Sequence, residues 1–181
     1  MRFEISFHTP FRVATGRARP GVDIAVDEQN ALPGSSLKGV MRAAASSIFP
    51  GKADLVAEVF GTARGASPWS WSRARFASLS RRPRARVAID PTTFTAEEEA
   101  LFVAEELWSA RADFEVLQIG RVADERLHGL VLRASAQAVH ALGGDRRRGL
   151  GWVSIRCLDP ALDAAEMDDI ISLASGNVAR A

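Results

Sequence analysis

The chain has 181 residues, of which 47% are hydrophobic and 25% are charged, and its formal net charge is +1. This length and composition are ordinary for a soluble globular protein with one sizeable domain, and the total charge gives no sign of an anionic partner. A single cysteine, Cys157, excludes an internal disulfide. The N-terminus shows no signal peptide and no apolar run reaches the ~18 residues of a membrane span, so we expect a cytoplasmic protein.

Charge is distributed unevenly along the chain. Residues 61–89 contain seven arginines and no acid, whereas residues 90–125 contain ten acids and two arginines. A local basic patch matters more for attracting an anion than the total charge does. The first segment is therefore a candidate anion-binding region.

The first half of the chain shows two alternating patterns and two helical ones. Phe3, Ile5 and Phe7 alternate with polar residues and predict a strand, and residues 22–27 alternate in the same way. A loop rich in glycine and arginine separates them. Amphipathic spacing then predicts helices over residues 36–48 and 52–60, with Pro50 and Gly51 between them.

The second half begins with an irregular stretch, residues 61–83. Alternation predicts strands at residues 84–89, 114–119 and 149–155, with a turn at residues 90–96. Apolar spacing predicts a long helix over residues 124–142, ended by Gly143 and Gly144 as a left-handed cap. The irregular mixture of strands and helices favours an α+β fold with a mostly antiparallel sheet.

One candidate binding motif is NALPGSSLKGVMR, residues 30–42. A helix N-terminus offers free N–H groups and a partial positive charge, and it readily binds phosphate. Ser35 and Ser36 add hydroxyl donors, Gly34 permits close approach of a backbone, and Lys38 and Arg42 share one helix face. The alternative is an ordinary serine-capped helix with two solvated cations.

A second candidate is GGDRRRGLG, residues 143–151. Glycines let the chain bend around a ligand, and the guanidinium groups of Arg146, Arg147 and Arg148 can follow phosphates. The alternative is a polar loop after a helix C-terminus, where cations are favoured anyway.

Three aromatic residues, Trp69, Trp71 and Phe76, lie between arginines in the irregular stretch. Aromatic rings stack on bases while arginines bind phosphates, which is the composition of a single-strand binding surface. The alternative is that these rings fill a core beneath a long loop.

The two motifs together resemble the RAMP superfamily of CRISPR-associated proteins, in particular the repeated backbone subunit of type III effector complexes. PGSSLKG followed by Val40-Met41-Arg42 resembles the N-terminal pattern of that family, and GGDRRRGLGWV resembles its glycine-rich loop. Val59-Phe60-Gly61 and the stretch VAIDPTTFTA, residues 87–96, fit the same family. The resemblance extends from Ile5 to about Ile155.

This resemblance implies a ferredoxin-like, RRM-related core with an inserted, thumb-like segment. We expect one domain over residues 1–181, with an arginine- and tryptophan-rich insertion at about 61–83 and the thumb-like insertion at about 90–113. The interval 90–113 is acidic and looks helical rather than like the hairpin of the family.

The resemblance also implies the ligand and the partners. The partners would be guide RNA, complementary target RNA, other CRISPR effector subunits and further copies of the chain itself, with no membrane. The residues expected to hold the RNA come from the two motifs: Gly34, Ser35, Ser36, Lys38, Arg42, Gly144, Arg146, Arg147, Arg148 and Gly149.

In the resembled subunit an aspartate ahead of PGSSLKG cleaves target RNA with a divalent metal. Asp23, after Gly21-Val22, matches that position best, and Mg²⁺ or another divalent cation would be its cofactor. The alternative is that Asp23 lies on the solvent face of an alternating strand and that the subunit is a non-catalytic structural or capping one.

A further alternative is a guide-processing endoribonuclease of the same superfamily, which would use histidine acid–base chemistry. The candidates are His8 at a strand end, His128 early in the long helix and His140 in its last turn. Cys157 has no neighbouring ligand cluster, so we predict no structural metal site.

Overall fold

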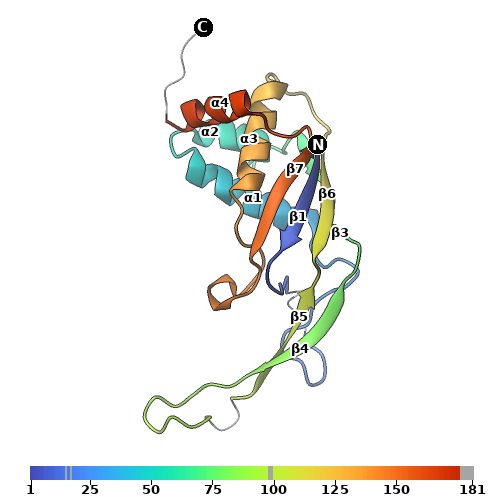
Figure 1. The fold of residues 1–181 in the computed structure, drawn as a ribbon, viewed down its shortest axis with the longest axis vertical. Helices are drawn as coiled ribbons and strands as arrows, with labels where there is room; N and C mark the ends of the chain where they lie inside the picture. Colours follow the sequence, from blue (N-terminus) through green and yellow to red (C-terminus); the bar gives the residue numbers. More distant parts are fainter. Residues whose placement is uncertain (15, 17, 98–99, 176–181) are drawn as a thin grey trace.

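The core of the fold is an antiparallel sheet in the order β2-β6-β1-β7 (Figure 1). The computed structural model describes residues 1–14, 16, 18–97 and 100–175. A further short strand, β3, pairs with the same edge of β6 as β2 does. The strands are β1 (Arg2–Phe7), β2 (Trp69–Trp71), β3 (Arg75–Phe76), β6 (Arg111–Gln118) and β7 (Val153–Asp159).

The alternation in β1 places its apolar residues in the core. Phe3, Ile5 and Phe7 are at most 5% exposed. Phe3 lies opposite Phe114 of β6, and the two rings stack with centroids 4.9 Å apart. The predicted strand is confirmed, because a period of two buries one face of a sheet.

Helices α1 (Gly34–Ile48), α2 (Ala53–Phe60) and α3 (Glu125–Gln137) pack beside the sheet, and α1 and α3 contact each other. Leu37, Met41 and Ala45 form the fully buried stripe of α1. The two helices predicted in the first half are confirmed. The chain order β1–α1–β2 followed by β6–α3–β7, with β1 and β6 central, is the expected ferredoxin-like arrangement in an α+β fold.

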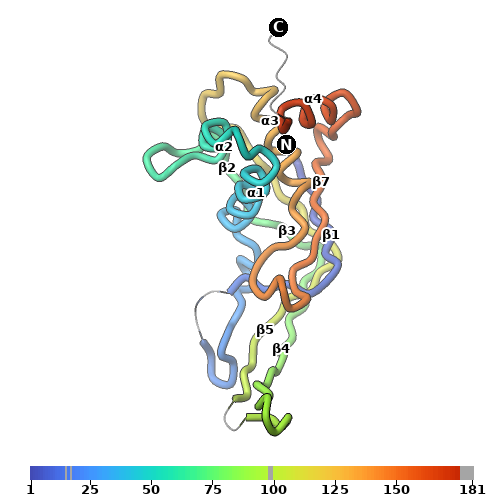
Figure 2. The backbone as a smooth tube through the Cα atoms, turned by 90° about the vertical axis from the view of Figure 1, so that its left-hand side faces the viewer, coloured from blue at the N-terminus to red at the C-terminus, as the bar shows by residue number. Residues whose placement is uncertain are grey.

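A two-stranded hairpin projects from the body and consists of β4 (Ser80–Arg86) and β5 (Phe102–Trp108) (Figures 1 and 2). The helical appearance predicted for residues 90–113 is wrong, because this interval contains β5 and the start of β6. Cross-strand pairing of its acids with the β4 arginines outweighs their helix propensity. The proposed bounds of the two insertions stay predictions.

The long helix predicted over residues 124–142 ends earlier than expected, at Gln137. His140 lies beyond it and accepts a backbone hydrogen bond from Val153, and Leu142 donates one to Gly151. Residues 140–142 thus extend along the chain that leads into β7. The apolar spacing of this segment suited either conformation, and pairing with β7 decided it.

The strand predicted over residues 22–27 forms isolated bridges instead of a regular ladder. Ile24 bridges to Ala104 of β5, and Val26 bridges to Ala14. Ala25 and Val26 are buried, so burial does not alternate as predicted. This segment runs beside β5 of the hairpin (Figures 1 and 2).

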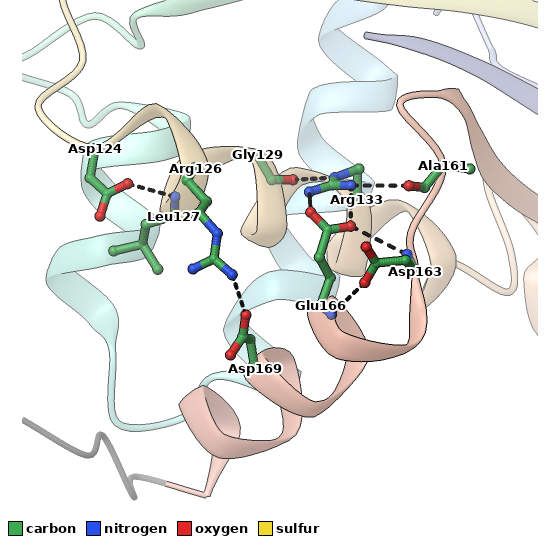
Figure 3. Close-up of polar contacts among 9 residues, drawn as sticks. All are labelled: Asp124, Arg126, Leu127, Gly129, Arg133, Ala161, Asp163, Glu166 and Asp169. Atoms are coloured by element: carbon green, nitrogen blue, oxygen red, sulfur yellow. Dashed lines mark hydrogen bonds and ion pairs between the residues drawn. The ribbon is translucent and has the colours of Figure 1, made fainter. Parts of the chain in front are cut away.

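A fourth helix, α4 (Ala164–Ala174), docks on α3 through charged residues (Figure 3). The guanidinium of Arg133, buried in α3, donates to both carboxylate oxygens of Glu166 at 2.6 and 2.7 Å. Asp163 and Glu166 form a reciprocal cap at the start of α4, and Arg126 pairs with Asp169 at 2.5 Å.

Candidate nucleic-acid interface

The glycine-rich loop is fixed by close backbone packing. Gly143 and Gly151 have positive φ values of 78° and 74°. A Cβ at Gly143 would overlap the carbonyl oxygen of Arg12, and one at Gly151 would overlap that of Leu142. Gly144 donates a hydrogen bond of 2.8 Å to the same Arg12 oxygen. The loop therefore has a defined shape without any ligand.

The three arginines of this loop form a single exposed 3₁₀ turn, Arg146–Arg148. None of their side chains has an ion pair or hydrogen bond within the described part of the chain. Gly149 ends the turn at φ 81°, and the position that a Cβ would occupy there is open. These guanidinium groups are therefore available to an anionic ligand.

Asp145, just before the turn, anchors it to the body of the protein. Its carboxylate accepts from Arg12 and, at 2.9 Å, from Arg86 of the hairpin. Arg12 is 3% exposed, and burial, followed by the charge of Arg86, lowers its pKa. Its Nη1 atom is buried and has no hydrogen-bond partner among the described residues.

A groove of about 600 Å³ lies between the glycine-rich loop and the tip end of the paired strands β4 and β5. Gly144 and Arg148 line one side, and Val87 and Phe102 line the hairpin side. Ile24 also lines it. The groove therefore joins three segments that are far apart in sequence.

Asp23, the predicted catalytic residue, lies next to Ile24 and thus close to this groove. Its backbone N–H donates to the carbonyl of Val103 at 2.8 Å, and its Oδ2 accepts from the N–H of Val103 at 2.7 Å. One carboxylate oxygen therefore ties the segment to β5. The side chain remains exposed, and Oδ1 has no described partner.

Buried Glu105 reinforces the attachment of this segment to the hairpin. Its Oε2 accepts from the N–H of Val26 at 2.9 Å and from Arg19 at 2.5 Å. Its Oε1 lies 3.2 Å from Arg81, which also contacts Glu28 at 3.0 Å. The segment that carries Asp23 is thus held by main-chain and ionic contacts together.

The second group of predicted residues lies at the start of α1 and does not line this groove. The helix begins after Pro33, with no side-chain cap and no acid in its first turn. Ser35 and Ser36 lie inside the helix, so the predicted alternative of a serine cap is wrong. Arg42 is exposed.

Two other residues of the α1 group have contacts within the fold. A Cβ at Gly34 would overlap the carbonyl oxygen of Trp71, so the close backbone approach at this glycine is made by β2. Lys38 Nζ lies 5.4 Å from the centroid of the Trp71 ring, which places its charge over an aromatic face.

The aromatic residues of the irregular stretch belong to the core. Trp69 is 8% exposed, and the indole N–H of Trp71 lies 3.3 Å from the sulfur of Met41. Phe76 stacks on Phe11 with centroids 5.7 Å apart. The alternative prediction, that these rings fill a core, is the one the structure favours.

The three histidines lie in different settings. His128 is buried and accepts from the indole of Trp69 at 3.1 Å, His8 lies 2.7 Å from the hydroxyl of Ser154, and His140 is exposed. Across the described residues, no group of three or more His, Cys, Asp or Glu side chains could hold a metal ion.

A family model of the RAMP superfamily matches residues 4–154. The chain belongs to this superfamily. The matched range contains the glycine-rich loop, the hairpin and both predicted motifs. No curated protein matches the chain.

Solved structures with a similar fold include two chains of type III-B Cmr-beta complexes. One is a chain of the type III-B Cmr-beta complex in its apo state, with a TM-score of 0.70 and 15% identity, covering 89% of this chain and 98% of that one. The other is a chain of Cmr-beta bound to cognate target RNA, with a TM-score of 0.67 and 14% identity, covering 86% and 95%. At these identities the likeness establishes the fold. In the described part of this RAMP chain, no helix is long and apolar enough to cross a membrane.

Reasoning from the sequence did not select Arg12, Arg86 or Asp145. Arg12 follows Phe11 in an unremarkable loop, and Arg86 is one of seven arginines in its region. Only the fold brings the three together. The signal that was present is Asp145 itself, the one acid inside an otherwise basic glycine-rich motif.

Proposed function

We propose that this chain is a guide-RNA-binding subunit of a type III CRISPR effector complex. The observation that carries the proposal is the exposed arginine turn, Arg146–Arg148, on a loop whose shape is fixed by Gly143, Gly151 and Asp145. Preorganised guanidinium groups bind phosphates without a further ordering cost. Membership of the RAMP superfamily supports the same ligand.

The start of α1 would supply a second set of phosphate contacts. Its first N–H groups have no side-chain acceptor, and Lys38 and Arg42 follow on the same face. Ser35 is exposed and adds a hydroxyl donor. Single-stranded RNA would contact both regions, while other subunits or further copies of this chain continue the binding surface.

The first test is to express the protein beside its native neighbours and to sequence the RNA that co-purifies with it. We expect a discrete RNA population that shares one repeat-derived end. Protein free of RNA that also fails to bind single strands at low salt would contradict the proposal, and the glycine motifs would then be turns without a ligand.

We propose further that Asp23 takes part in cutting target RNA. Its exposed position beside the groove supports this role, as does its Oδ1, which has no partner among the described residues. A divalent cation such as Mg²⁺ on that oxygen would supply charge stabilisation at a phosphate. Asp23 itself would orient the cation, while its Oδ2 keeps the segment attached to Val103.

Asp23→Asn is the sharpest variant, because an amide oxygen can still accept from the Val103 N–H. We expect guide binding to stay at the wild-type level and target cutting to be lost. Asp27→Asn, a nearby exposed carboxylate that accepts from the N–H groups of Gln29 and Asn30, is the control. Undiminished cutting by Asp23→Asn would remove the catalytic role.

The second candidate is a non-catalytic structural or capping subunit of the same kind of complex. The hydrogen bond from Val103 to Asp23 favours it, because that bond alone gives the carboxylate a structural role. Assembled complex that binds target RNA but leaves it uncut with and without Mg²⁺ would establish this alternative.

A further inference from the structure

A second pocket, of about 670 Å³, lies at the end of the molecule opposite the hairpin tip. It is formed where α2 ends, where the chain enters β2, and where residues 119–124 connect β6 to α3 (Figure 1). Pro68, Val122 and Leu127 give it apolar walls, and Arg121 lines it. This volume is in the range of small-molecule sites.

His128 places a hydrogen-bond donor at this pocket. The indole N–H of Trp69 can only donate, so Nδ1 of His128 must be the unprotonated acceptor of their 3.1 Å bond. The neutral ring therefore carries its proton on Nε2. The side chain is 7% exposed, and Nε2 has no hydrogen bond among the described residues.

Glu58 places an acceptor beside that donor. Its Oε2 lies 3.8 Å from His128 Nε2, which is longer than a hydrogen bond. The carboxylate is 68% exposed and can adjust to a ligand. A fixed donor and an adjacent carboxylate thus face the same space without satisfying each other.

An adjacent carbonyl and N–H on a flat ring would satisfy both groups at once. Guanine fits best, because its O6 accepts from His128 while its N1–H and N2–H groups donate to the two oxygens of Glu58. The apolar walls suit the faces of a ring, and Arg121 suits an attached phosphate. We propose that this pocket binds a guanine base, from a free guanine nucleotide or from an unpaired residue of an RNA strand.

The proposal goes beyond guide binding, because none of the residues that line this pocket belongs to the glycine-rich loop or to α1. Titration of the purified chain with guanosine monophosphate, by calorimetry, tests it directly. We expect saturable binding, with adenosine and uridine monophosphates weaker by about tenfold or more. Equal binding of all three nucleotides, or no binding at millimolar concentration, would overturn it.

Variants locate the site. Glu58→Gln should lower the affinity for guanosine monophosphate by about tenfold and reduce the preference for it over adenosine monophosphate. Asp54→Asn, an exposed acid one turn earlier in α2, is the matched control and should change affinity less than about twofold. An unchanged affinity in Glu58→Gln would place the nucleotide elsewhere and sink the assignment.

Two further experiments are needed. The first distinguishes RNA from a free nucleotide as the source of the guanine, and the second distinguishes this pocket from the proposed guide-binding site. Single strands that differ by one guanine, compared in wild type and Glu58→Gln, show whether RNA occupies the pocket; a guanine preference confined to free nucleotide assigns it to a small ligand. Arg148→Ala should bind guanosine monophosphate as wild type does, even where it weakens RNA binding. Failure of guide binding therefore leaves this inference intact, and the reverse also holds.

Discussion

Two arginine-rich regions of the molecule differ in whether acids neutralise them. Three of the four arginines of β4 have partners among the described residues: Arg81 contacts Glu105 and Glu28, Arg84 contacts Glu106, and Arg86 contacts Asp145. The arginines of the glycine-rich loop have no side-chain partner in the described residues. The strand β4 contains more arginines than the glycine-rich loop, but fewer of them are available to an anionic ligand.

This difference shows that the number of cations in a segment does not locate an anion site. The acids of residues 90–125 fold back beside the arginines of residues 61–89, so the charge imbalance along the chain becomes cross-strand pairing in the hairpin. Such pairs stabilise a two-stranded hairpin that lacks a core of its own. In the loop, Asp145 binds Arg12 and Arg86 and leaves the three following arginines unpaired.

Removing the unpaired arginines should have the largest effect. Replacing Arg146, Arg147 and Arg148 together by alanine should lower the affinity for single-stranded RNA by about 100-fold at 0.1 M salt. The slope of log affinity against log salt concentration should fall by about 2 in magnitude, since each phosphate contact on a single strand contributes about 0.7. Fluorescence anisotropy across a salt series measures both quantities.

The matched control removes three paired arginines of equal charge. Arg75, Arg111 and Arg156 are exposed and contact Glu115 or Glu4. Their triple alanine variant should retain most of the RNA affinity, because these cations are already neutralised. An equal loss in both variants would mean that net charge, and not the loop, determines binding.

Breaking the paired region should instead reduce stability. Glu105→Ala leaves Arg19, Arg81 and the N–H of Val26 without their acceptor, so we expect a loss of about 3 kcal/mol in the free energy of unfolding. Urea denaturation followed by tryptophan fluorescence measures it. Glu115→Ala, which breaks a more exposed pair, should cost less than about 1 kcal/mol. Similar losses in the two variants would contradict the comparison.

The conformation of a segment could be predicted from the sequence where the periodicity of its apolar residues determines it, but not where pairing with a distant segment does. The alternation of Phe3, Ile5 and Phe7 predicted a strand, and the apolar stripe of α1 predicted a helix, because both patterns reflect burial of one face of a single element. Residues 102–108 and 140–142 were misassigned, since partners distant in sequence decide their conformation. Gly34 was selected for the close approach of a ligand backbone, whereas the backbone that approaches it in the fold is that of Trp71, which no local pattern names.

The glycines of the loop give a smaller and more local test. Gly143→Ala places a Cβ against the Arg12 carbonyl at positive φ, so we expect about 2 kcal/mol of destabilisation and weaker RNA binding. Gly144→Ala puts its Cβ 3.8 Å from the same oxygen at an ordinary φ and should change stability by less than about 0.5 kcal/mol. Thermal unfolding of both variants, with RNA binding measured in parallel, makes the comparison. Equal tolerance at both positions would show that the loop lacks the fixed shape that we ascribe to it.

The smallest effect concerns α4, where the ion pair between Arg133 and Glu166 is the more buried of the two that join it to α3. Hydrogen bonds from Arg133 hold the pKa of the Glu166 carboxyl below its usual range. A lowered folded-state pKa means that the pair stabilises the protein above the ordinary glutamate pKa, and that this stability is lost as the pH falls through the folded-state value. Glu166→Gln should therefore cost about 1 kcal/mol at neutral pH, and the difference from wild type should shrink below about pH 4. Urea titrations of both proteins from neutral pH down to about pH 3 measure it. A difference that does not change with pH would assign the docking of α4 to packing and to the helix cap at Asp163, and would leave the charge of Glu166 without a role.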